Sequence, residues 1–141
     1  MTVRSVLTLA AGLASILIAA PAHGHHSFAA ECDSTKPISF TGTVTKVEWM
    51  NPHARIYVDV KDEAGKVVNW DCELGPPNGL MRRGWRRDSL KAGHVVTVSG
   101  FRSKLSPVGA NARTVKLPDG RQVFAGSSFD TGAVPEENEK K

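Results

Sequence analysis

Histidine is the residue type with the clearest chemistry in this sequence, and it occurs at five positions. His25 and His26 are adjacent near the N-terminal end, His53 belongs to an Asn-Pro-His turn, and His94 precedes an apolar segment. Imidazole suits copper, zinc and nickel, and square-planar sets of nitrogen ligands favour Cu(II) or Ni(II). The pattern predicts a metal site at His25, His26 and His53, whereas His94 is expected only to begin a strand. The alternative is that these histidines are solvent-exposed or cap turns.

Cysteine occurs at two positions, Cys32 and Cys72, which excludes a four-cysteine zinc site and a disulfide-dense scaffold. In an exported protein, an even number of cysteines favours a disulfide. We therefore expect a Cys32–Cys72 disulfide, which requires the two Cα atoms to lie within about 7 Å of each other. The alternative is two separately buried thiols. No Cys-x-x-Cys motif favours a redox role.

A basic cluster surrounds one tryptophan, and it consists of Arg82, Arg83, Trp85, Arg86 and Arg87. Arginines with an interleaved aromatic residue can bind phosphates or stacked bases. The net charge of the whole chain is only +4, and residues 1–24 have the layout of a signal for export, which argues against nucleic acid as the partner. We expect that the cluster either contacts an anionic surface or an acidic partner in the cell envelope, or consists of solvated arginines beside a helix end.

Three carboxylates occupy outward positions of two expected strands. They are Asp59, Asp71 and Glu73, and the last two share a face of their strand. Paired carboxylates can act as general acid and base, but such residues more often form the solvated face of a sheet. No Ser–His–Asp or Cys–His arrangement, nucleotide-binding glycine pattern or G-x-S-x-G motif is present. The sequence therefore favours a protein that is not an enzyme.

Residues 1–24 have the layout of a secretory signal peptide. Arg4 is followed by the uncharged apolar run Val6–Ala20, which Pro21 ends. This run is shorter than the roughly 20 residues that a membrane-spanning helix needs. Cleavage after Ala22 or after Gly24 fits the rule for small residues at the cleavage site. We expect a periplasmic protein with no transmembrane anchor after processing and with histidine as its first residue.

The cleavage position decides which metal ligands the N-terminus offers. After cleavage at Gly24, the amine and the imidazole of His25 form one chelate, and His53 can supply a third nitrogen, as in a histidine brace. After cleavage at Ala22, the segment His23-Gly24-His25 offers an amine, two backbone amides and an imidazole, which is a square-planar set that does not need the fold. Both cases make copper the expected metal.

Alternating apolar residues predict a small all-β domain over residues 25–132, followed by a charged tail over 133–141 that we expect to be disordered. A phase slip between Val44 and Val47 predicts a bulge in the first strand. A short helix or an irregular segment is expected through residues 81–83, closed by Gly84 as a cap. The expected strands cover residues 38–50, 56–61, 68–74, 94–101, 113–117 and 122–125.

Three consecutive strands, a short helix and two further strands follow the order of an OB-type barrel. The long bulged first strand agrees with this order. The predicted fold is therefore a small OB-like five-stranded barrel with one short helix between the third and fourth strands. A compact β-sandwich is the alternative.

Four segments of the chain resemble a family of small exported bacterial proteins that contain a domain of unknown function. They are HHSFAAE, GTVTKVEWMNPHARIYVDV, NWDCELGPPNGLMRRGW and ANARTVKLPDGR, which together cover essentially the whole mature chain. The HHSF and W-x-N-P-H motifs are the most specific features. The resemblance implies export, a compact β-rich domain and no established activity. The chain differs from the family pattern at Cys32 and Cys72, where apolar residues are common, and at Arg55, where an aromatic residue is common.

Two functions are compatible with these observations. The first is a non-catalytic OB-like binding or adaptor module of the cell envelope, which uses the outer sheet face or the arginine cluster to bind an unidentified ligand or partner. The second is a periplasmic Cu(II)-binding protein that uses His25, His26 and His53. The distance between His53 and the mature N-terminus distinguishes them, because a shared copper site requires both within ligand distance.

Overall fold

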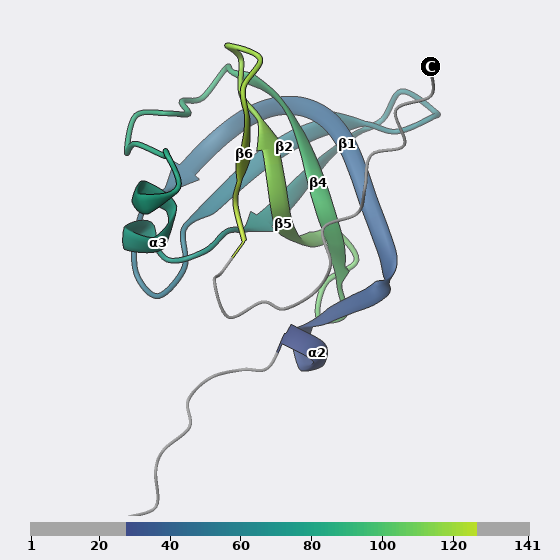
Figure 1. The fold of residues 1–141 in the computed structure, drawn as a ribbon. Coiled ribbons are helices and arrows are strands. Elements are labelled where there is room, and N and C mark those ends of the chain that lie inside the picture. The colour runs from purple at the N-terminus through teal and green to yellow at the C-terminus, as the bar shows by residue number, and fades with distance from the viewer. Residues whose placement is uncertain (1–27, 127–141) are drawn as a thin grey trace, which may run out of the picture.

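A computed structural model describes residues 28–126 as a strongly curved β-sheet with two short helices (Figure 1). No helix in this range is long and apolar enough to cross a membrane. The expected signal peptide and the expected disordered tail lie outside the described residues. The elements are α2 (Phe28–Glu31), β1 (Cys32–Glu48), β2 (Arg55–Lys61), β3 (Val67–Glu73), α3 (Pro77–Arg82), β4 (Val95–Ser103), β5 (Gly109–Lys116) and β6 (Gln122–Phe124).

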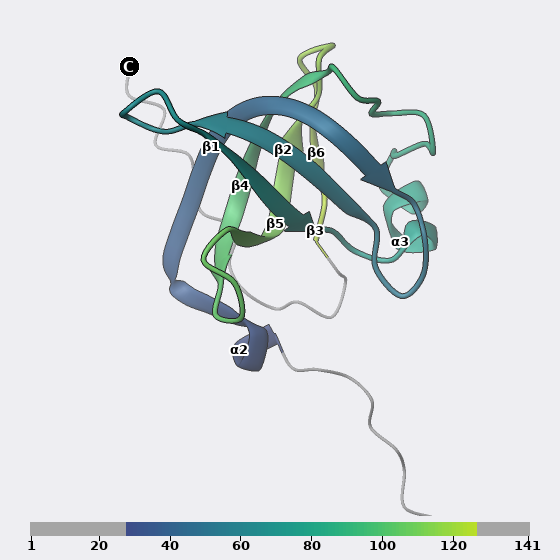
Figure 2. The same ribbon diagram turned by 180° about the vertical axis from the view of Figure 1, so that it is seen from behind.

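The strands form a nearly closed ring. Their order in the sheet is β3-β2-β1-β4-β5-β6, and neighbours in this order are antiparallel. β3 also pairs with β5 in parallel, so that Cys72 lies opposite Ala110 and Glu73 lies opposite Asn111. This pairing closes five strands into the ring, and β6 extends the sheet from β5. The expected all-β, barrel-like fold with a helix between the third and fourth strands is confirmed (Figures 1 and 2).

β1 pairs along its length with two different strands. Its N-terminal part pairs with β4, and its C-terminal part pairs with β2. The register with β2 shifts between Val44 and Lys46, where the sequence predicts a bulge. Bulges increase the local bend and twist of a strand, which helps a sheet to close. Gly42 precedes this bend, and a Cβ at this position would lie only 2.4 Å from the carbonyl oxygen of Asp59.

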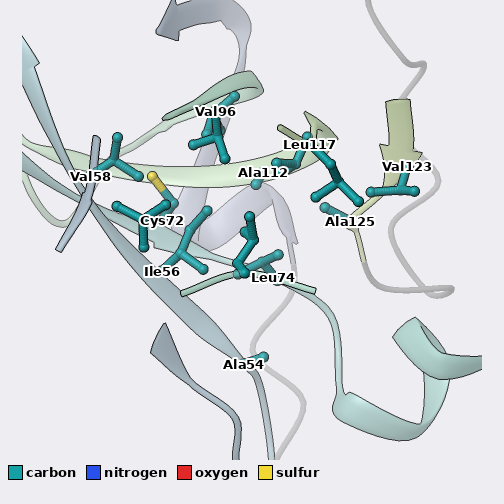
Figure 3. Packing of buried hydrophobic residues seen from close by; sticks show 14 of the residues in the cluster. Ala54, Ile56, Val58, Cys72, Leu74, Val96, Ala112, Leu117, Val123 and Ala125 are labelled. Carbon is teal, nitrogen blue, oxygen red and sulfur yellow. The ribbon is translucent and has the colours of Figure 1, made fainter. Parts of the chain in front are cut away.

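The inward residues of the strands meet in one hydrophobic core (Figure 3). Val58, Cys72 and Ala112 have no exposed surface. In Figure 3 the sulfur of Cys72 lies among the core side chains next to Val58 and Ile56. The faces of β2 and β3 that the alternation of apolar and polar residues predicts to point inward therefore do face the core.

α3 and the segment after it supply buried side chains at one end of the ring. Leu80 and Trp85 are buried there with the core of the sheet. Pro77 stands at the start of α3, where its missing N–H leaves no hydrogen bond unmade. Gly84 follows the helix with φ +93°, which confirms the expected cap. The helix begins earlier than residues 81–83 because its first turn, with buried Pro77, also packs inward.

Two segments differ from the sequence expectation. α2 and the N-terminal part of β1, Cys32–Pro37, carry no alternating apolar pattern, yet Cys32 pairs with Ser103 of β4. β5 begins at Gly109, within a stretch that the sequence predicts as loop. Its residues from Gly109 to Arg113 are all buried, so neither face shows the polar alternation that identifies a half-exposed strand.

Candidate functional site

A groove of about 270 Å³ lies where α2, β3 and the β4–β5 connection meet. Figure 2 shows this connection beside α2, at the same end of the ring as the C-terminal half of β3. The polar residues that define the groove are Glu31, Arg55, Asp71, Glu73, Ser103, Ser106 and Asn111, and its apolar lining includes Cys32, Leu105, Gly109 and Ala110. We call this feature the acidic groove, because its lining contains three carboxylates and one guanidinium.

Arg55 organises the side of the groove that is formed by β2 and β3. Its Nη1 donates to both carboxylate oxygens of Asp71 at 2.8 Å, and its Nη2 donates to Glu73 Oε2 at 2.7 Å. Burial by itself would lower the pKa of Arg55, but the hydrogen bond and charge of Asp71, together with the charge of Glu73, raise this pKa above its ordinary value. The antiparallel register of β2 and β3, with Arg55 opposite Glu73, produces this network directly.

His53 extends the same network from the turn before β2. Its Nδ1 lies 2.8 Å from Glu73 Oε1, so Glu73 contacts Arg55 with one oxygen and His53 with the other. The His53 side chain is 39 % exposed. The contact orients the imidazole through Nδ1. His53 is therefore placed beside the acidic groove rather than in the core.

Asn111 contributes an unusual polar atom to the groove. This residue is 8 % exposed, and its Oδ1 has no hydrogen-bond partner among the described residues. A buried acceptor without a partner costs about 1–3 kcal/mol of stability. β5 holds Asn111 opposite Glu73 in the parallel pairing of β3 and β5, which brings the amide next to the carboxylate network. Unpaired buried acceptors are uncommon in folded proteins, and binding sites are one place where they occur.

α2 lies at one end of the acidic groove and is held by aromatic contacts. The ring of Phe28 meets that of Phe101 edge-on, with centroids 5.7 Å apart. The guanidinium of Arg113, a residue with no exposed surface, lies 4.6 Å from the centroid of Phe28. The backbone N–H of Lys104 also donates to the carbonyl oxygen of Glu31 at 2.8 Å. Phe28 of the HHSF motif thus anchors the start of the domain beside the groove.

The arginine cluster is divided between surface and core. Trp85 is only 3 % exposed, and its indole N–H donates to the carbonyl oxygen of Phe124 at 2.8 Å. The ring is therefore not an exposed platform for stacking bases. Arg83 stacks on the ring of Phe124 at 4.1 Å, and Arg86 lies 3.9 Å from Asp88. A cavity of only about 10 Å³ beside Trp85 leaves room for at most a water molecule.

The two remaining arginines of the cluster, Arg82 and Arg87, are exposed. Neither forms an ion pair with another residue of the described segment. Asp59, the third carboxylate that the sequence singles out, accepts a 2.7 Å hydrogen bond from Asn69 on the solvated face of the sheet. It does not belong to the acidic groove.

The expected Cys32–Cys72 disulfide is absent from the structure, and this prediction is wrong for the described fold. Cys32 pairs with β4 at the start of β1, whereas Cys72 lies in β3. Cys32 lies opposite Ser103 of β4, whereas Cys72 lies opposite Ile56 of β2 and Ala110 of β5, so the two cysteines occupy different positions of the sheet. Burial raises the pKa of the Cys72 thiol to about 12.

The histidines are only partly covered by the structure. His25 and His26 lie outside the described residues, so their distance from His53 is not part of the described geometry. Within residues 28–126, no three or more histidine, cysteine or carboxylate side chains are grouped in a way that could hold a metal ion. His94 stands directly before β4, as expected, and its Nδ1 accepts a hydrogen bond from the backbone N–H of Lys91 at 3.3 Å.

A family model matches residues 12–111, and its description is DUF6152, a family of unknown function. The chain belongs to the DUF6152 family. The match includes His25, His26 and His53 and ends at Asn111, so it covers the HHSF and N-P-H motifs. No curated protein and no solved structure matches the chain.

Sequence reasoning identified some of the residues that form the acidic groove in this DUF6152 protein. It placed Asp71 and Glu73 on one outward face, which the structure confirms, but it did not include Arg55 in the site. The sequence pattern of β2 does carry this signal, because Arg55 occupies the outward phase beside Ile56. Asn111 and Ser106 could not be found in this way, since they come from a segment without a periodic pattern.

Proposed function

We propose that this DUF6152 protein is a non-catalytic binding module of the bacterial cell envelope, exported to the periplasm, and that its ligand occupies the acidic groove. The observation that carries the proposal is the position of this groove. It lies between the outer face of β3 and the β4–β5 connection of a five-stranded ring. OB-type barrels use the face of strands 2 and 3 and the loop between strands 4 and 5 to bind ligands.

The polar network of the groove supports binding rather than acid–base catalysis. Asp71 and Glu73 both accept hydrogen bonds from Arg55. An acid–base pair requires two groups in environments that differ enough to make one a proton donor and the other a proton acceptor. Here the same guanidinium serves both carboxylates, which suits recognition by fixed hydrogen-bonding groups.

The test is an unbiased search for ligands with the processed protein. Isotope-labelled protein is mixed with a small-molecule extract of bacterial periplasm, and backbone amide shifts are followed by NMR. We expect shift changes that cluster at residues of the acidic groove, such as Ser106, Gly109 and Asn111. The absence of any shift change in extracts of several growth conditions would overturn the proposal.

A groove-filling variant provides the specific control. Ser106 lines the groove from the β4–β5 connection, and Ser106→Trp places a large ring over it. Shift changes that vanish in this variant confirm the location of the ligand. Val67→Trp is the matched control, because Val67 is 51 % exposed on β3 and does not line the groove. Shift changes that survive Ser106→Trp unaltered would place the ligand elsewhere.

Cu(II) binding is the second candidate function, and the contact between His53 and Glu73 favours it. Histidine ligands of metals commonly donate one ring nitrogen to a carboxylate, which orients the ring and leaves the other nitrogen for the metal. With Nδ1 of His53 at 2.8 Å from Glu73 Oε1, Nε2 remains for such a role. The expected partners of His53 are His25 and His26, which precede the anchoring residue Phe28 in sequence.

A further inference from the structure

We propose that the acidic groove accepts an organic cation, namely a guanidinium or primary ammonium group on a short alkyl stem. This inference rests on the proposed binding function and specifies the chemistry of the ligand. It combines three observations: an unpartnered acceptor, an excess of negative charge, and a groove of limited size with an apolar rim.

The unpartnered acceptor requires a ligand that donates hydrogen bonds. Asn111 is more than nine-tenths buried, its Oδ1 has no partner, and the residue lines the groove. A carbonyl oxygen can only accept a hydrogen bond, so a ligand satisfies it only with an N–H or O–H group. Carboxylates and phosphodiesters, which lack such donors when ionised, do not fit this position.

The charge of the lining selects a positive ligand. The carboxylates of Asp71 and Glu73 line the groove and share the one guanidinium of Arg55, so that this side of the lining carries more negative than positive charge. This local excess of negative charge occurs on a chain whose formal net charge is +4. Arg55 already donates hydrogen bonds to both Asp71 and Glu73, so its guanidinium is not available to bind an anion. An anion entering the groove would therefore be repelled by the net negative charge of Asp71, Glu73 and Arg55.

The size and rim of the groove favour a small organic group over a bare ion. A volume of about 270 Å³ has room for several heavy atoms, whereas a single water needs only about 10–15 Å³ on this measure. Leu105, which is 75 % exposed, provides apolar surface along which an alkyl stem can lie. A terminal guanidinium or ammonium then reaches the carboxylates and Asn111.

Two sources can supply this chemistry: a free small molecule such as a polyamine, or an arginine or lysine side chain of a partner protein. The test uses agmatine, which carries a guanidinium and a primary amine on one alkyl stem, and the blocked peptide acetyl-Gly-Arg-Gly-amide. Both are titrated into the processed protein by calorimetry at low salt. Saturable binding of agmatine supports a free ligand, and binding of the peptide alone supports a side chain of a partner. 1,4-Butanediol is the uncharged control and is expected not to bind.

Two substitutions test the geometry in opposite directions. Asn111→Leu removes the unpartnered acceptor, and we expect the affinity for the cation to fall at least tenfold while the fold remains as stable or becomes more stable. Arg55→Gln leaves Asp71 and Glu73 without their internal cation, and we expect the affinity to rise several-fold. Arg82→Gln, which removes an exposed arginine of the cluster, is the matched control and is expected to leave the affinity unchanged.

Failure of this inference can be distinguished from failure of the proposed function. If periplasmic extract perturbs the groove but neither agmatine nor the peptide binds, the binding module stands and the cationic ligand is wrong. If Arg55→Gln remains folded by circular dichroism and binds the cation more weakly than the natural chain, the charge argument is overturned. If Arg55→Gln does not fold, Glu73→Gln replaces it, and an affinity that does not decrease in that variant contradicts the inference.

Discussion

The indole nitrogen of Trp85 and the carbonyl oxygen of Phe124 are joined by a hydrogen bond of 2.8 Å between the segment after α3 and the last strand of the sheet. This bond satisfies the polar atom of the Trp85 side chain, a residue that is only 3 % exposed. Arg83 stacks on the Phe124 ring from outside at 4.1 Å. The basic cluster therefore forms a cover over one end of the barrel core, with its aromatic residue facing inward.

Substitution of Trp85 should measure how much this cover contributes to stability. Trp85→Ala is expected to lower the free energy of unfolding by about 3–5 kcal/mol, because it removes a large buried ring and leaves a cavity. Trp85→Phe should cost less, about 1–3 kcal/mol, since the Phe124 carbonyl loses its donor while most of the packing remains. Urea unfolding followed by circular dichroism gives both values.

The matched control for this prediction is Arg86→Ala in the same segment. Arg86 is exposed and its contact with Asp88 is 3.9 Å long, so we expect a change within about 0.5 kcal/mol. A Trp85→Ala variant as stable as Arg86→Ala would contradict the structural role of the indole and would restore Trp85 as a candidate surface aromatic.

Two glycines should respond to alanine in opposite ways. A Cβ at Gly100 would lie 2.0 Å from the backbone oxygen of Asn111, so Gly100→Ala must push β4 and β5 apart and should cost about 3 kcal/mol or more. A Cβ at Gly79 in α3 would make its closest contact, with Pro76, at an ordinary 3.5 Å. Gly79→Ala should therefore stabilise the protein by about 0.5–1 kcal/mol through its higher helix propensity. Thermal unfolding of both variants checks the sign, and equal effects would be inconsistent with the β4–β5 contact.

Cys72 should make stability depend on pH in the alkaline range. Burial raises the pKa of its thiol from 9.0 to about 12, so the folded protein keeps this proton where the unfolded chain loses it. The contribution of Cys72 is fully present below pH 9 and is lost as the pH rises toward 12. Relative to Cys72→Ala, the free energy of unfolding of the natural chain should decrease by about 1.4 kcal/mol between pH 8 and pH 10.

Thiol labelling tests the same environment without unfolding experiments. At pH 8 in native buffer, Cys72 should not react with iodoacetamide, because the reactive thiolate is scarce and the side chain is buried. In denaturant, it should react fully without any reducing agent. A requirement for reductant would show that the thiol is bonded to Cys32 after all, and rapid native labelling would contradict its place in the core.

The fold was largely predictable from this sequence, and the groove only in part. Ile56, Val58 and their neighbours alternate with polar residues because one side of β2 faces the core, so periodicity identifies the strand. Asn111 lies in a strand buried on both faces, where alternation disappears and the segment resembles a loop. Its proximity to Glu73 depends on the parallel pairing of β3 with β5, which is a long-range closure that local patterns do not contain.

The disulfide prediction failed for a related reason. Export and an even number of cysteines argue that a bond is chemically favoured, but they contain no information on distance. The positions of the two cysteines follow from long-range strand pairing, which places Cys32 opposite Ser103 of β4 and Cys72 opposite Ala110 of β5. The alternative of two separately buried cysteines describes the structure better.

Phe28 should contribute measurably to the stability of the fold. Phe28→Ala removes the edge contact with Phe101 and the surface on which Arg113 stacks. We expect a loss of about 1–3 kcal/mol, which combines lost burial with lost aromatic and cation–π contacts. Phe28→Tyr keeps the ring and should cost less than Phe28→Ala. Amide hydrogen exchange at Lys104, whose backbone N–H donates to Glu31, reports on release of α2. Unchanged exchange in Phe28→Ala would contradict the anchoring role.

The copper hypothesis can be decided with protein that carries its natural N-terminus. If processing occurs after Gly24, the amine and imidazole of His25 bind Cu(II) together with His53, and His53→Ala should weaken binding strongly. Glu73→Gln should weaken it less, by about 10–100-fold at most, because Glu73 orients the His53 ring through its 2.8 Å contact with Nδ1. His94→Ala is the matched control, since His94 lies directly before β4 and its Nδ1 contacts the backbone of Lys91 instead of this network.

If processing occurs after Ala22, the chelate His23-Gly24-His25 is complete within the chain terminus, and His53→Ala should leave Cu(II) affinity nearly unchanged. An extra residue before the natural first residue should weaken binding in both cases, because it displaces the amine ligand. Intact-mass measurement identifies the processed terminus, and competition titration with a Cu(II) chelator gives the affinities. Affinity no greater than that of the denatured chain would remove copper as a candidate, and the contact between His53 and Glu73 would then serve only to order the wall of the acidic groove.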